Sequence, residues 1–348
     1  MELMKLGWEA FFEKQYVQKQ YEVGRIVLEH KHLYRIITEA GELLGELSGR
    51  FRYEATVKSD YPAVGDWVWI QTIPAEKKAV IHGVFKRKSL FSRQAAGDKT
   101  EEQVVASNID YVFLVNALNR DFNLRRMERY LLLAYESGAV PVVILTKRDL
   151  CEDIEDKVVQ TKAVAFGVDV FAVDSLSGTG IAELRQFVRP GKTIALLGSS
   201  GAGKSTLLNA LMGSAVSKTG GIRESDDKGK HTTTHRELFQ LPSGALIIDT
   251  PGMRELQLWE GSESMDVTFS DIDELSGQCR FVDCKHETEP GCAVKHAIEE
   301  GNLQQERFTS YKKLQREIAY AMRKQDPVLA RAEREKWKKI NKAMSRKK

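Results

Sequence analysis

The sequence predicts a chain of several domains, in which a helix-covered parallel sheet lies between a small all-β domain and a helical segment with metal-ligand residues. Three observations support this. Short strand-like pieces separated by glycines fill residues 21–92, apolar runs alternate with helical stretches across residues 104–262, and three cysteines and a histidine gather in residues 279–292. A length of 348 residues, 42% of them hydrophobic, leaves room for two or three domains of ordinary size.

The N-terminal part is interpreted from side-chain spacing. Trp8, Phe12 and Tyr16 recur at roughly helical spacing and predict a short helix within residues 1–20. In residues 21–92, apolar pieces such as Trp67–Ile70 alternate with glycines, a pattern typical of small barrels. A length of about 70 residues suits an OB-fold. Another small β domain remains the alternative.

From residue 104 onward the pattern becomes α/β. Four apolar runs are predicted to be strands: Tyr111–Val115, Pro141–Leu145, Val168–Val173 and Thr193–Leu197. Helices are expected near 124–137, 151–165 and 181–188. Continuous apolar strands that alternate with helices indicate a parallel sheet covered on both faces. The polar stretch Ser92–Gln103 is expected to join this domain to the barrel.

A phosphate-binding loop follows the last of these strands. Residues 198–205 match Gly-x-x-x-x-Gly-Lys-Ser, with a strand before and a helix expected after. The backbone amides of such a loop turn toward phosphate oxygens, and the helix dipole adds to their attraction. Lys204 is expected to pair with the β and γ phosphates and Ser205 to bind Mg²⁺. The predicted phosphate-contacting residues are Gly198, Ser199, Ser200, Gly201, Ala202, Gly203, Lys204 and Ser205.

Two further motifs lie downstream of this loop. Asp249 begins an Asp-Thr-Pro-Gly motif after an apolar strand, where its carboxylate can hold a water on Mg²⁺, and the Gly252 amide can contact the γ-phosphate. Among the three threonines 232–234, Thr233 is the expected magnesium ligand, and its two neighbours remain alternatives. Met253 occupies the place where many GTPases carry a water-orienting Gln. The nearest candidates for that catalytic role are His231 and His235, and His231 is our hypothesis. An exposed loop histidine is the alternative.

The residues expected to read the base come earlier in the chain. Thr146-Lys147-Arg148-Asp149 follows a strand, and Ser175-Leu176-Ser-Gly follows a later one. Asp149 can accept from guanine N1–H and the exocyclic amine, a donor pair that adenine lacks. The Lys147 stem can pack on the purine, and the backbone near Leu176 would meet O6. Thr146 stands where Asn is usual, yet a Thr hydroxyl can still bridge loops.

The order of these motifs is rotated. A GTPase normally has its phosphate loop first and its base-reading loops last, whereas here residues 146–149 and 175–178 precede residues 198–205. Five motifs in this order predict a circularly permuted GTPase.

The cysteine-rich segment predicts a metal site. Cys279-x4-Cys284-x-His286-x5-Cys292 supplies three thiolates and one imidazole, a set that suits a closed, structural Zn²⁺ site. The segment has few apolar residues, so the metal would contribute much of its folding free energy. Ordinary buried cysteines are the alternative.

Charge and hydropathy suggest the surroundings in which the chain works. Residues 331–348 carry nine Lys or Arg and two Glu. Such a segment suggests a polyanionic partner, and a solvated helix is an equal alternative. There is no run of 18 apolar residues and no N-terminal pattern of a secretory signal, so we expect a cytoplasmic protein without membrane contact.

Taken together, these motifs make the chain similar to the RsgA family (also YjeQ or YloQ) of GTPases that depend on the small ribosomal subunit. The matching stretches are Thr146–Asp149, Gly198–Thr206, His231–Thr234, Asp249–Gly252 and Cys279–Cys292. The resemblance implies an α/β circularly permuted P-loop GTPase domain with an N-terminal all-β OB-fold barrel and a C-terminal α-helical zinc-binding domain. It adds Thr206 to the nucleotide-binding residues and places the family's switch-loop histidine at His231.

The resemblance also implies a function. It indicates a GTP hydrolase with GTP or GDP, Mg²⁺ and one structural Zn²⁺, stimulated by the 30S subunit, in contact with 16S rRNA, and monomeric. The expected segments are an N-terminal helical extension (1–20), the OB-fold domain (21–92), the permuted GTPase domain (104–262), the zinc-binding domain (263–325) and a basic helical tail (326–348). The alternatives are a permuted GTPase acting on another RNA or on the large subunit, and a nucleotide-independent RNA-binding protein.

Overall fold

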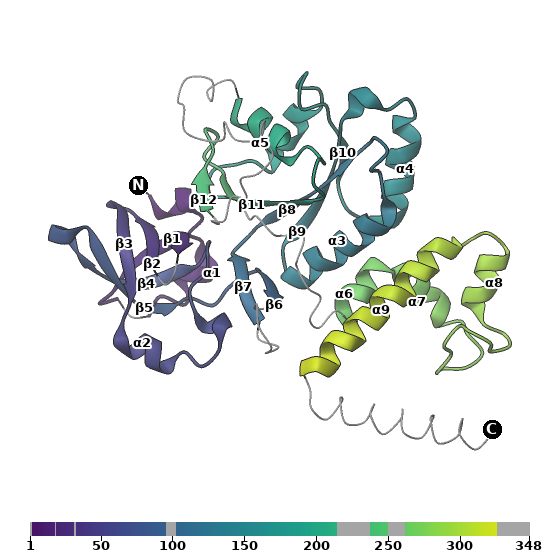
Figure 1. The fold of residues 1–348 in the computed structure, drawn as a ribbon, viewed down its shortest axis with the longest axis horizontal. Helices are drawn as coiled ribbons and strands as arrows, with labels where there is room; N and C mark the ends of the chain where they lie inside the picture. Colours follow the sequence, from purple (N-terminus) through teal and green to yellow (C-terminus); the bar gives the residue numbers. More distant parts are fainter. Residues whose placement is uncertain are drawn as a thin grey trace, which may run out of the picture. The chain divides into compact units, whose positions relative to one another are not determined.

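The computed structural model divides into two compact units, residues 1–257 and 258–348, which are described separately (Figure 1). It describes residues 2–17, 19–30, 33–94, 102–213, 237–249 and 262–325. Within these residues, no helix is both long and apolar enough to cross a membrane.

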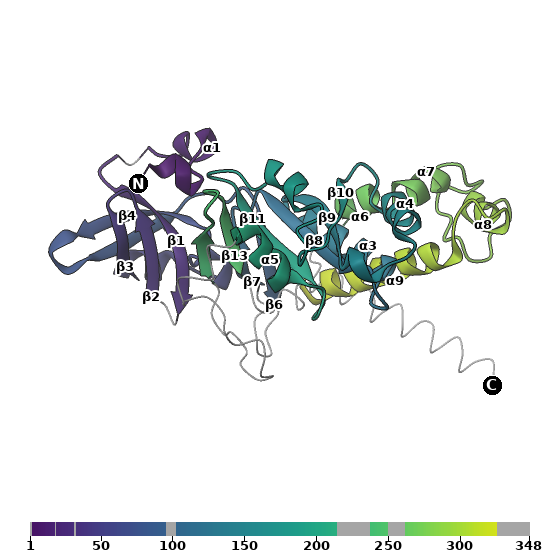
Figure 2. The same ribbon diagram turned by 90° about the horizontal axis from the view of Figure 1, so that it is seen from above.

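The first unit begins with a closed five-stranded barrel. Its strands are β1 (Glu22–His30), β2 (Leu33–Thr38), β3 (Gly41–Leu47), β4 (Trp67–Ile73) and β5 (Lys78–Val84). They are joined in the order β1-β2-β3-β5-β4, and β4 pairs back onto β1 to close the barrel (Figures 1 and 2). Ile26, Ile36, Ile70 and Ile81 are fully buried at its centre. The predicted OB-like barrel is therefore confirmed.

Short helices lie in the connections between the strands of this barrel. A helix not anticipated from the sequence, α2 (Gly49–Glu54), follows β3 and is capped by Ser48, whose hydroxyl accepts from the Phe51 N–H. The 3₁₀ turns η2 (Lys58–Asp60) and η3 (Pro74–Glu76) flank β4.

The N-terminal segment is less regular than the single helix expected. It forms two short turns, η1 (Leu3–Leu6) and α1 (Ala10–Glu13). Gly7 separates them at φ +90°, where a Cβ would lie only 2.8 Å from the side chain of Arg25 and from a backbone oxygen of Gly191. The turn at Gly7 lets Trp8 and Phe12 pack against Trp67 of the barrel.

The polar stretch after the barrel contains structure that its composition did not indicate. β6 (Leu90–Gln94) and β7 (Glu102–Ser107) form an antiparallel two-stranded sheet. Phe91, Val104 and Ala106 are buried, so this sheet has an apolar side of its own. These three residues flank the polar stretch Ser92–Gln103, which was expected only to join two domains, so the pairing of the strands at its two ends was not anticipated.

The α/β part of the first unit is a six-stranded sheet. Its strands are β8 (Tyr111–Ala117), β9 (Val140–Thr146), β10 (Val170–Ala172), β11 (Thr193–Gly198), β12 (Glu237–Gln240) and β13 (Leu246–Asp249). They lie in the order β10-β9-β8-β11-β13-β12, and β12 is antiparallel to β13 and continues through one pairing onto β1 of the barrel. β11, which leads into the phosphate loop, is thus central, between β8 and β13.

Helices cover both faces of this sheet, as predicted. The elements are α3 (Leu124–Ser137), η4 (Arg148–Leu150), α4 (Ile154–Val164), η5 (Ile181–Gln186) and α5 (Lys204–Met212). Leu207 of α5 and Leu184 of η5 join Phe113 and Val115 in one apolar core. Val112 and Leu114 alternate with these residues and are buried on the other face, where α3 packs beside β8 and β9. The helix expected at 181–188 is a 3₁₀ turn.

A buried polar network connects the barrel to the sheet. Arg25 of β1, 1% exposed, donates to the backbone oxygens of Leu6, Gly65 and Asn108, and its burial lowers its pKa to about 10. Asp66 is fully buried and accepts from Arg87 and from the Ser107 hydroxyl of β7. Since unpaired buried charges are costly, these contacts fix the barrel against the start of the sheet.

Asp110 extends this network to the strand before the phosphate loop. Its carboxylate accepts from Lys88 (2.8 Å), Lys192 (3.1 Å) and the backbone N–H of Thr193 (2.8 Å) at the first residue of β11. Burial alone would raise the pKa of Asp110, but the hydrogen bonds from Lys88 and Thr193 outweigh it and hold the pKa below its ordinary value.

The second unit is helical. It contains α6 (Ser262–Thr268), α7 (Ser270–Ser276), α8 (Ala293–Glu299) and α9 (Gln305–Gln325). Arg307 of α9 makes two hydrogen bonds to the Asp271 carboxylate, at 2.6 and 2.7 Å, and its guanidinium lies over the Phe269 ring. Bidentate geometry of this kind is specific, so it sets how α9 lies on α7. The helix expected at 328–345 lies outside the described residues.

Asp110→Asn tests the polar network. The variant keeps an oxygen for the Thr193 N–H but removes the charge that pairs with Lys88 and Lys192, so we expect a loss of about 1–3 kcal/mol in the free energy of unfolding at pH 7. A lowered pKa contributes stability above the unfolded-state value of about 3.9 and loses it as pH falls through the folded-state value. Urea unfolding of both proteins at several pH values should show the difference closing below about pH 4; a difference independent of pH would contradict this account.

Candidate nucleotide site and metal centre

The end of β9 and the phosphate loop meet in space. Thr146, the last residue of β9, is 1% exposed, and its hydroxyl donates to the backbone oxygen of Ala202 at 2.6 Å. These residues are 56 positions apart in the chain. A Cβ at Gly203 would come within 3.3 Å of the same hydroxyl, so this position needs a glycine for the close approach. The Thr that replaces the usual Asn thus does bridge the two loops.

The phosphate loop has the backbone geometry that its sequence requires. Gly201 and Gly203 have φ of +74° and +89°, a region that favours glycine. A Cβ at Gly198 would lie 2.4 Å from the backbone oxygen of Val115. Lys204, Ser205 and Thr206 form the first turn of α5. The loop therefore presents amides and a helix N-terminus, both of which favour an anion.

The Lys204 side chain folds back over this loop. Its ammonium donates to the backbone oxygens of Gly198 (2.8 Å) and Ser199 (2.7 Å). These contacts keep the cation beside the amides that would receive a phosphate.

The base-reading residues follow β9 and β10. Lys147 has φ of +58°, which ends the strand abruptly, and Arg148 and Asp149 continue into η4 with Asp149 exposed. The Arg148 N–H donates to Val173, which joins this turn to the loop that carries Ser175. The Ser175 hydroxyl is buried and has no hydrogen-bond partner among the described residues, an arrangement that suits a ligand group.

The Ser175–Gly178 loop is held by a residue that sequence reasoning missed. Asp174 accepts from the backbone N–H groups of Leu176 (2.9 Å) and Ser177 (3.2 Å). Hydrogen bonding to the Ser177 side chain, and then to these N–H groups, lowers the pKa of Asp174. Leu176 is 82% exposed. An Asp that directly precedes a Ser-rich turn is the signal for such a side-chain turn.

Part of the predicted site lies outside the described residues. These are His231, Thr233 and Gly252, together with the side chain of Asp249. The backbone of Asp249 ends β13, and β13 runs parallel to β11 with Ile248 opposite Ala195. Because carboxyl ends of parallel strands share one sheet edge, Asp249 begins its motif on the phosphate-loop side.

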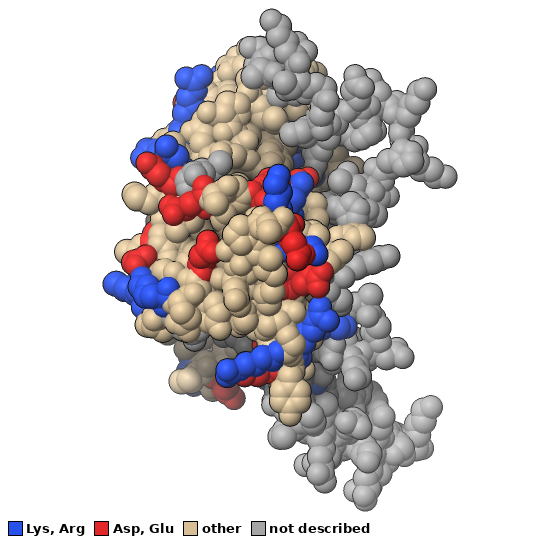
Figure 3. Space-filling view, turned by 90° about the vertical axis from the view of Figure 1, so that its left-hand side faces the viewer, with Lys and Arg blue, Asp and Glu red and all other residues tan. Residues whose placement is uncertain are grey.

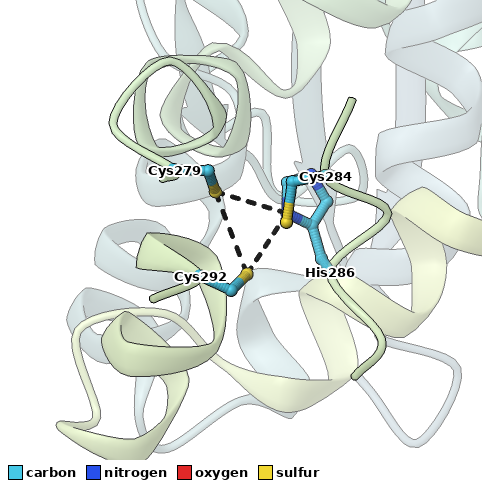
Figure 4. A group of neighbouring side chains, drawn as sticks. All are labelled: Cys279, Cys284, His286 and Cys292. Atoms are coloured by element: carbon cyan, nitrogen blue, oxygen red, sulfur yellow. Dashed lines mark hydrogen bonds between the residues drawn. The ribbon is translucent and has the colours of Figure 1, made fainter. Parts of the chain in front are cut away.

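The four predicted zinc ligands converge in the second unit (Figure 4). Cys279 follows α7, Cys292 precedes α8, and the ligand atoms of Cys279, Cys284, His286 and Cys292 all lie within 4.8 Å of one another. The sulfur atoms of Cys279 and Cys292 are 3.9 Å apart. A tetrahedral Zn²⁺ with bonds of about 2.3 Å would have sulfur–sulfur edges of about 3.8 Å. The donor set and its spacing are compatible with zinc.

His286 faces this cluster through one defined nitrogen. Its Nδ1 lies 3.3 Å from the sulfur of Cys292 and 3.6 Å from that of Cys279, while Nε2 lies 3.1 Å from the Ser276 hydroxyl. That hydroxyl donates to the Ile272 oxygen at 2.8 Å, so it accepts from Nε2–H. Nδ1 then carries the free lone pair that a metal needs.

The surroundings of His286 also favour its uncharged form. Burial, with Lys312 nearby, lowers the pKa of His286 and favours the neutral imidazole, which is the metal-binding form. The backbone of His286 has φ of +59°, a value that few residues other than glycine adopt. Ser276 was not anticipated, because no sequence motif marks a residue that acts through a ligand.

The fold and the two loop clusters define the class of protein. The strands that lead to the predicted base-reading loops, β9 and β10, precede the phosphate-loop strand β11 in the chain, and in the sheet only β8 separates β9 from β11. This is the arrangement of a circularly permuted GTPase. Solved structures with this fold include YjeQ from Thermotoga maritima (TM-score 0.64, 28% identity, covering 85% of this chain and 98% of that one) and YloQ, described as a circularly permuted GTPase (TM-score 0.62, 28% identity, covering 87% and 96%).

Sequence comparisons then show the family. The RsgA GTPase family model matches residues 84–259. The small ribosomal subunit biogenesis GTPase RsgA of Opitutus terrae is 48% identical over 98% of this chain and 96% of its own length, and RsgA 1 of Listeria innocua is 46% identical over 99% and 97%. The chain belongs to the RsgA GTPase family and is a GTP hydrolase. An ABC transporter model also matches residues 182–346, less than half of the chain, a stretch that includes the phosphate loop but not the base-reading loops.

Thr146→Val tests the contact between the two loops. Valine keeps the shape but leaves the Ala202 oxygen without its donor, so the dissociation constant for a fluorescent guanine nucleotide should rise about five- to tenfold. Thr146→Ser retains the hydroxyl and should bind almost as the parent does. Equal affinity of the Val variant and the parent in a fluorescence titration would rule out this role.

Ser276→Ala tests the metal centre. Loss of the hydroxyl that orients His286 should weaken zinc binding by about tenfold or more. Competition with a chromogenic chelator measures this directly and does not require GTP hydrolysis. Ser270→Ala, at the start of the same helix, is the matched control and should bind zinc as the parent does. Indistinguishable zinc affinity of the two variants would show that Ser276 has no such effect.

Proposed function

We propose that this chain hydrolyses GTP when bound to the 30S ribosomal subunit and so assists a late step of its maturation. The observation that carries this proposal is the identity of 48% and 46% to relatives named small ribosomal subunit biogenesis GTPases, over at least 96% of each chain. Similarity over the whole length includes the barrel, the GTPase domain and the cysteine cluster together. The proposed site of action is the cytoplasm, and the proposed state is a monomer.

In the proposed nucleotide site, the two loop clusters share one GTP. Asp149 reads the guanine edge, with Lys147 against the ring and the loop at Ser175 and Leu176 beside it. The amides from Gly198 to Thr206 and the Lys204 ammonium bind the phosphates, as the adjoining helix N-terminus favours.

The proposed hydrolytic residues surround the γ-phosphate. Ser205 and Thr233 hold Mg²⁺, which neutralises phosphate charge when bound, and Asp249 orients one of its waters. The Gly252 amide contacts the γ-phosphate. His231 orients the attacking water, because Met253 has no group that can polarise it. We further propose that hydrolysis is slow until the ribosomal subunit orders these groups.

The proposed domains are 21–92 (OB-fold), 104–262 (GTPase) and 263–325 (zinc-binding), with the extensions 1–20 and 326–348. Zn²⁺ held by Cys279, Cys284, His286 and Cys292 would supply folding free energy to the zinc-binding domain. The short helices α7 and α8 bury only Ile272, and Val294 and Ala297, respectively, which supports a structural role for the metal.

The proposed RNA partner is 16S rRNA. On the face in Figure 3, which looks onto the barrel side, basic and acidic side chains are interspersed among uncharged ones. Attraction to phosphate is expected from the nine Lys and Arg residues of 331–348, and it should weaken with salt. Tyr53 of α2 is 89% exposed and offers a ring for base stacking.

The experiment is GTP turnover measured alone and with purified 30S or 50S subunits. We expect acceleration by 30S subunits only. Lys204→Ala should abolish turnover under all conditions, because the phosphates lose their main cation. His231→Ala should keep nucleotide affinity and lose at least about tenfold of the stimulated rate.

Other outcomes of this experiment point elsewhere. Stimulation by 50S subunits alone would contradict the proposed partner, and normal stimulated turnover in the His231 variant would remove the proposed role of that side chain. Turnover retained in the Lys204 variant would show that the observed activity belongs to a contaminant.

A further inference from the structure

The loop between β8 and α3, residues 118–123, touches both halves of the nucleotide site. It contains none of the five nucleotide motifs. The backbone N–H of Leu118 donates to the Thr146 oxygen at 2.9 Å, at the end of the base-reading strand. At its other end, the Asn123 side chain caps α3 by accepting from the Arg126 N–H at 3.0 Å. The loop is therefore fixed at both ends.

Asp121, between these ends, reaches the phosphate loop. Its carboxylate accepts from the Ser199 hydroxyl at 2.7 Å, and it accepts twice from the Arg126 guanidinium, at 2.7 and 3.0 Å. The Asp121 backbone N–H donates to the Asn119 side chain at 3.0 Å. Both carboxylate oxygens and the backbone N–H of Asp121 thus have hydrogen-bond partners among the described residues.

The charge of Asp121 needs its arginine. The hydrogen bonds from Arg126 and then Ser199 hold the pKa of Asp121 below its ordinary value, so the group is ionised at neutral pH. An unpaired carboxylate beside a phosphate loop would repel the nucleotide. The bidentate Arg126 contact cancels that charge and aims one oxygen at Ser199.

We propose that Asp121 is a positioning residue of the nucleotide site, which holds the first turn of the phosphate loop through Ser199. Ser199 follows Gly198 directly, and its own backbone oxygen accepts from the Lys204 ammonium. Fixing the Ser199 side chain therefore fixes the peptide that holds Lys204. A loop that is already ordered before the nucleotide arrives loses less conformational entropy on binding.

The same loop couples the two motif clusters. Residues 118–123 contact Thr146 through Leu118 and the phosphate loop through Asp121, and Thr146 itself contacts Ala202. Three segments far apart in sequence close a ring of hydrogen bonds. The inference rests on the nucleotide site proposed above, and it adds residues 118–123 to the base-reading and phosphate loops as a third segment of that site.

The test is a double-mutant cycle on nucleotide affinity, measured with a fluorescent GDP analogue and the full chain. Asp121→Ala and Ser199→Ala should each raise the dissociation constant about five- to tenfold. The double variant should be no weaker than either single one, because both remove the same contact. Asp121→Asn keeps an acceptor for the Ser199 hydroxyl and should recover most of the affinity, an outcome that a purely structural role of the charge would not give.

Controls separate this inference from the wider proposal. Asp156→Ala removes an exposed carboxylate of α4 in the same domain and should bind as the parent does. If the parent binds the analogue and Asp121→Ala binds it equally well, or if the two single effects multiply in the double variant, the inference is wrong while the proposed nucleotide site stands. Should Asp121→Ala fail to fold, the Asp121→Asn and Ser199→Ala pair still gives the comparison.

Discussion

A hydrogen bond from the Thr146 hydroxyl to the Ala202 oxygen connects the two loop clusters that permutation separates in the chain. Because this hydrogen bond is buried, losing it would cost more free energy than losing a hydrogen bond at the surface. The contact depends on Gly203, which allows the close approach, and on the parallel strands that place the end of β9 next to β8 and β8 next to β11. Strand order in the sheet, and not order along the chain, therefore brings the two loop clusters together.

The barrel is connected to this sheet by buried charge rather than by apolar packing alone. Arg25, Asp66 and Asp110 each satisfy two or three partners, and together they span from the N-terminal turn to the first residue of β11. β12 also pairs with β1, so the barrel and the GTPase sheet share backbone contacts. The barrel is therefore connected through buried contacts to β11, the strand that leads into the phosphate loop.

Local sequence patterns predicted most of the fold, because an apolar strand or a motif can be recognised from a few consecutive residues. The barrel, the covered sheet and the convergence of Cys279, Cys284, His286 and Cys292 were predictable in this way. The β6–β7 sheet, the break at Gly7 and the 3₁₀ turn η5 were not, because tertiary contacts decide them. Asp121, Asp174 and Ser276 were also missed: each contacts a predicted site residue, and only the folded chain shows which one.

The central claim is that purine-reading and phosphate-binding loops, in rotated order, build a single pocket. The most direct measurement is a crystal structure with a non-hydrolysable GTP analogue and Mg²⁺. The account predicts the Asp149 carboxylate at about 2.7–3.2 Å from the guanine N1 and exocyclic nitrogen, with Lys204 on the phosphates of the same molecule. A nucleobase bound away from Asp149, with the phosphates still in the loop, would contradict it.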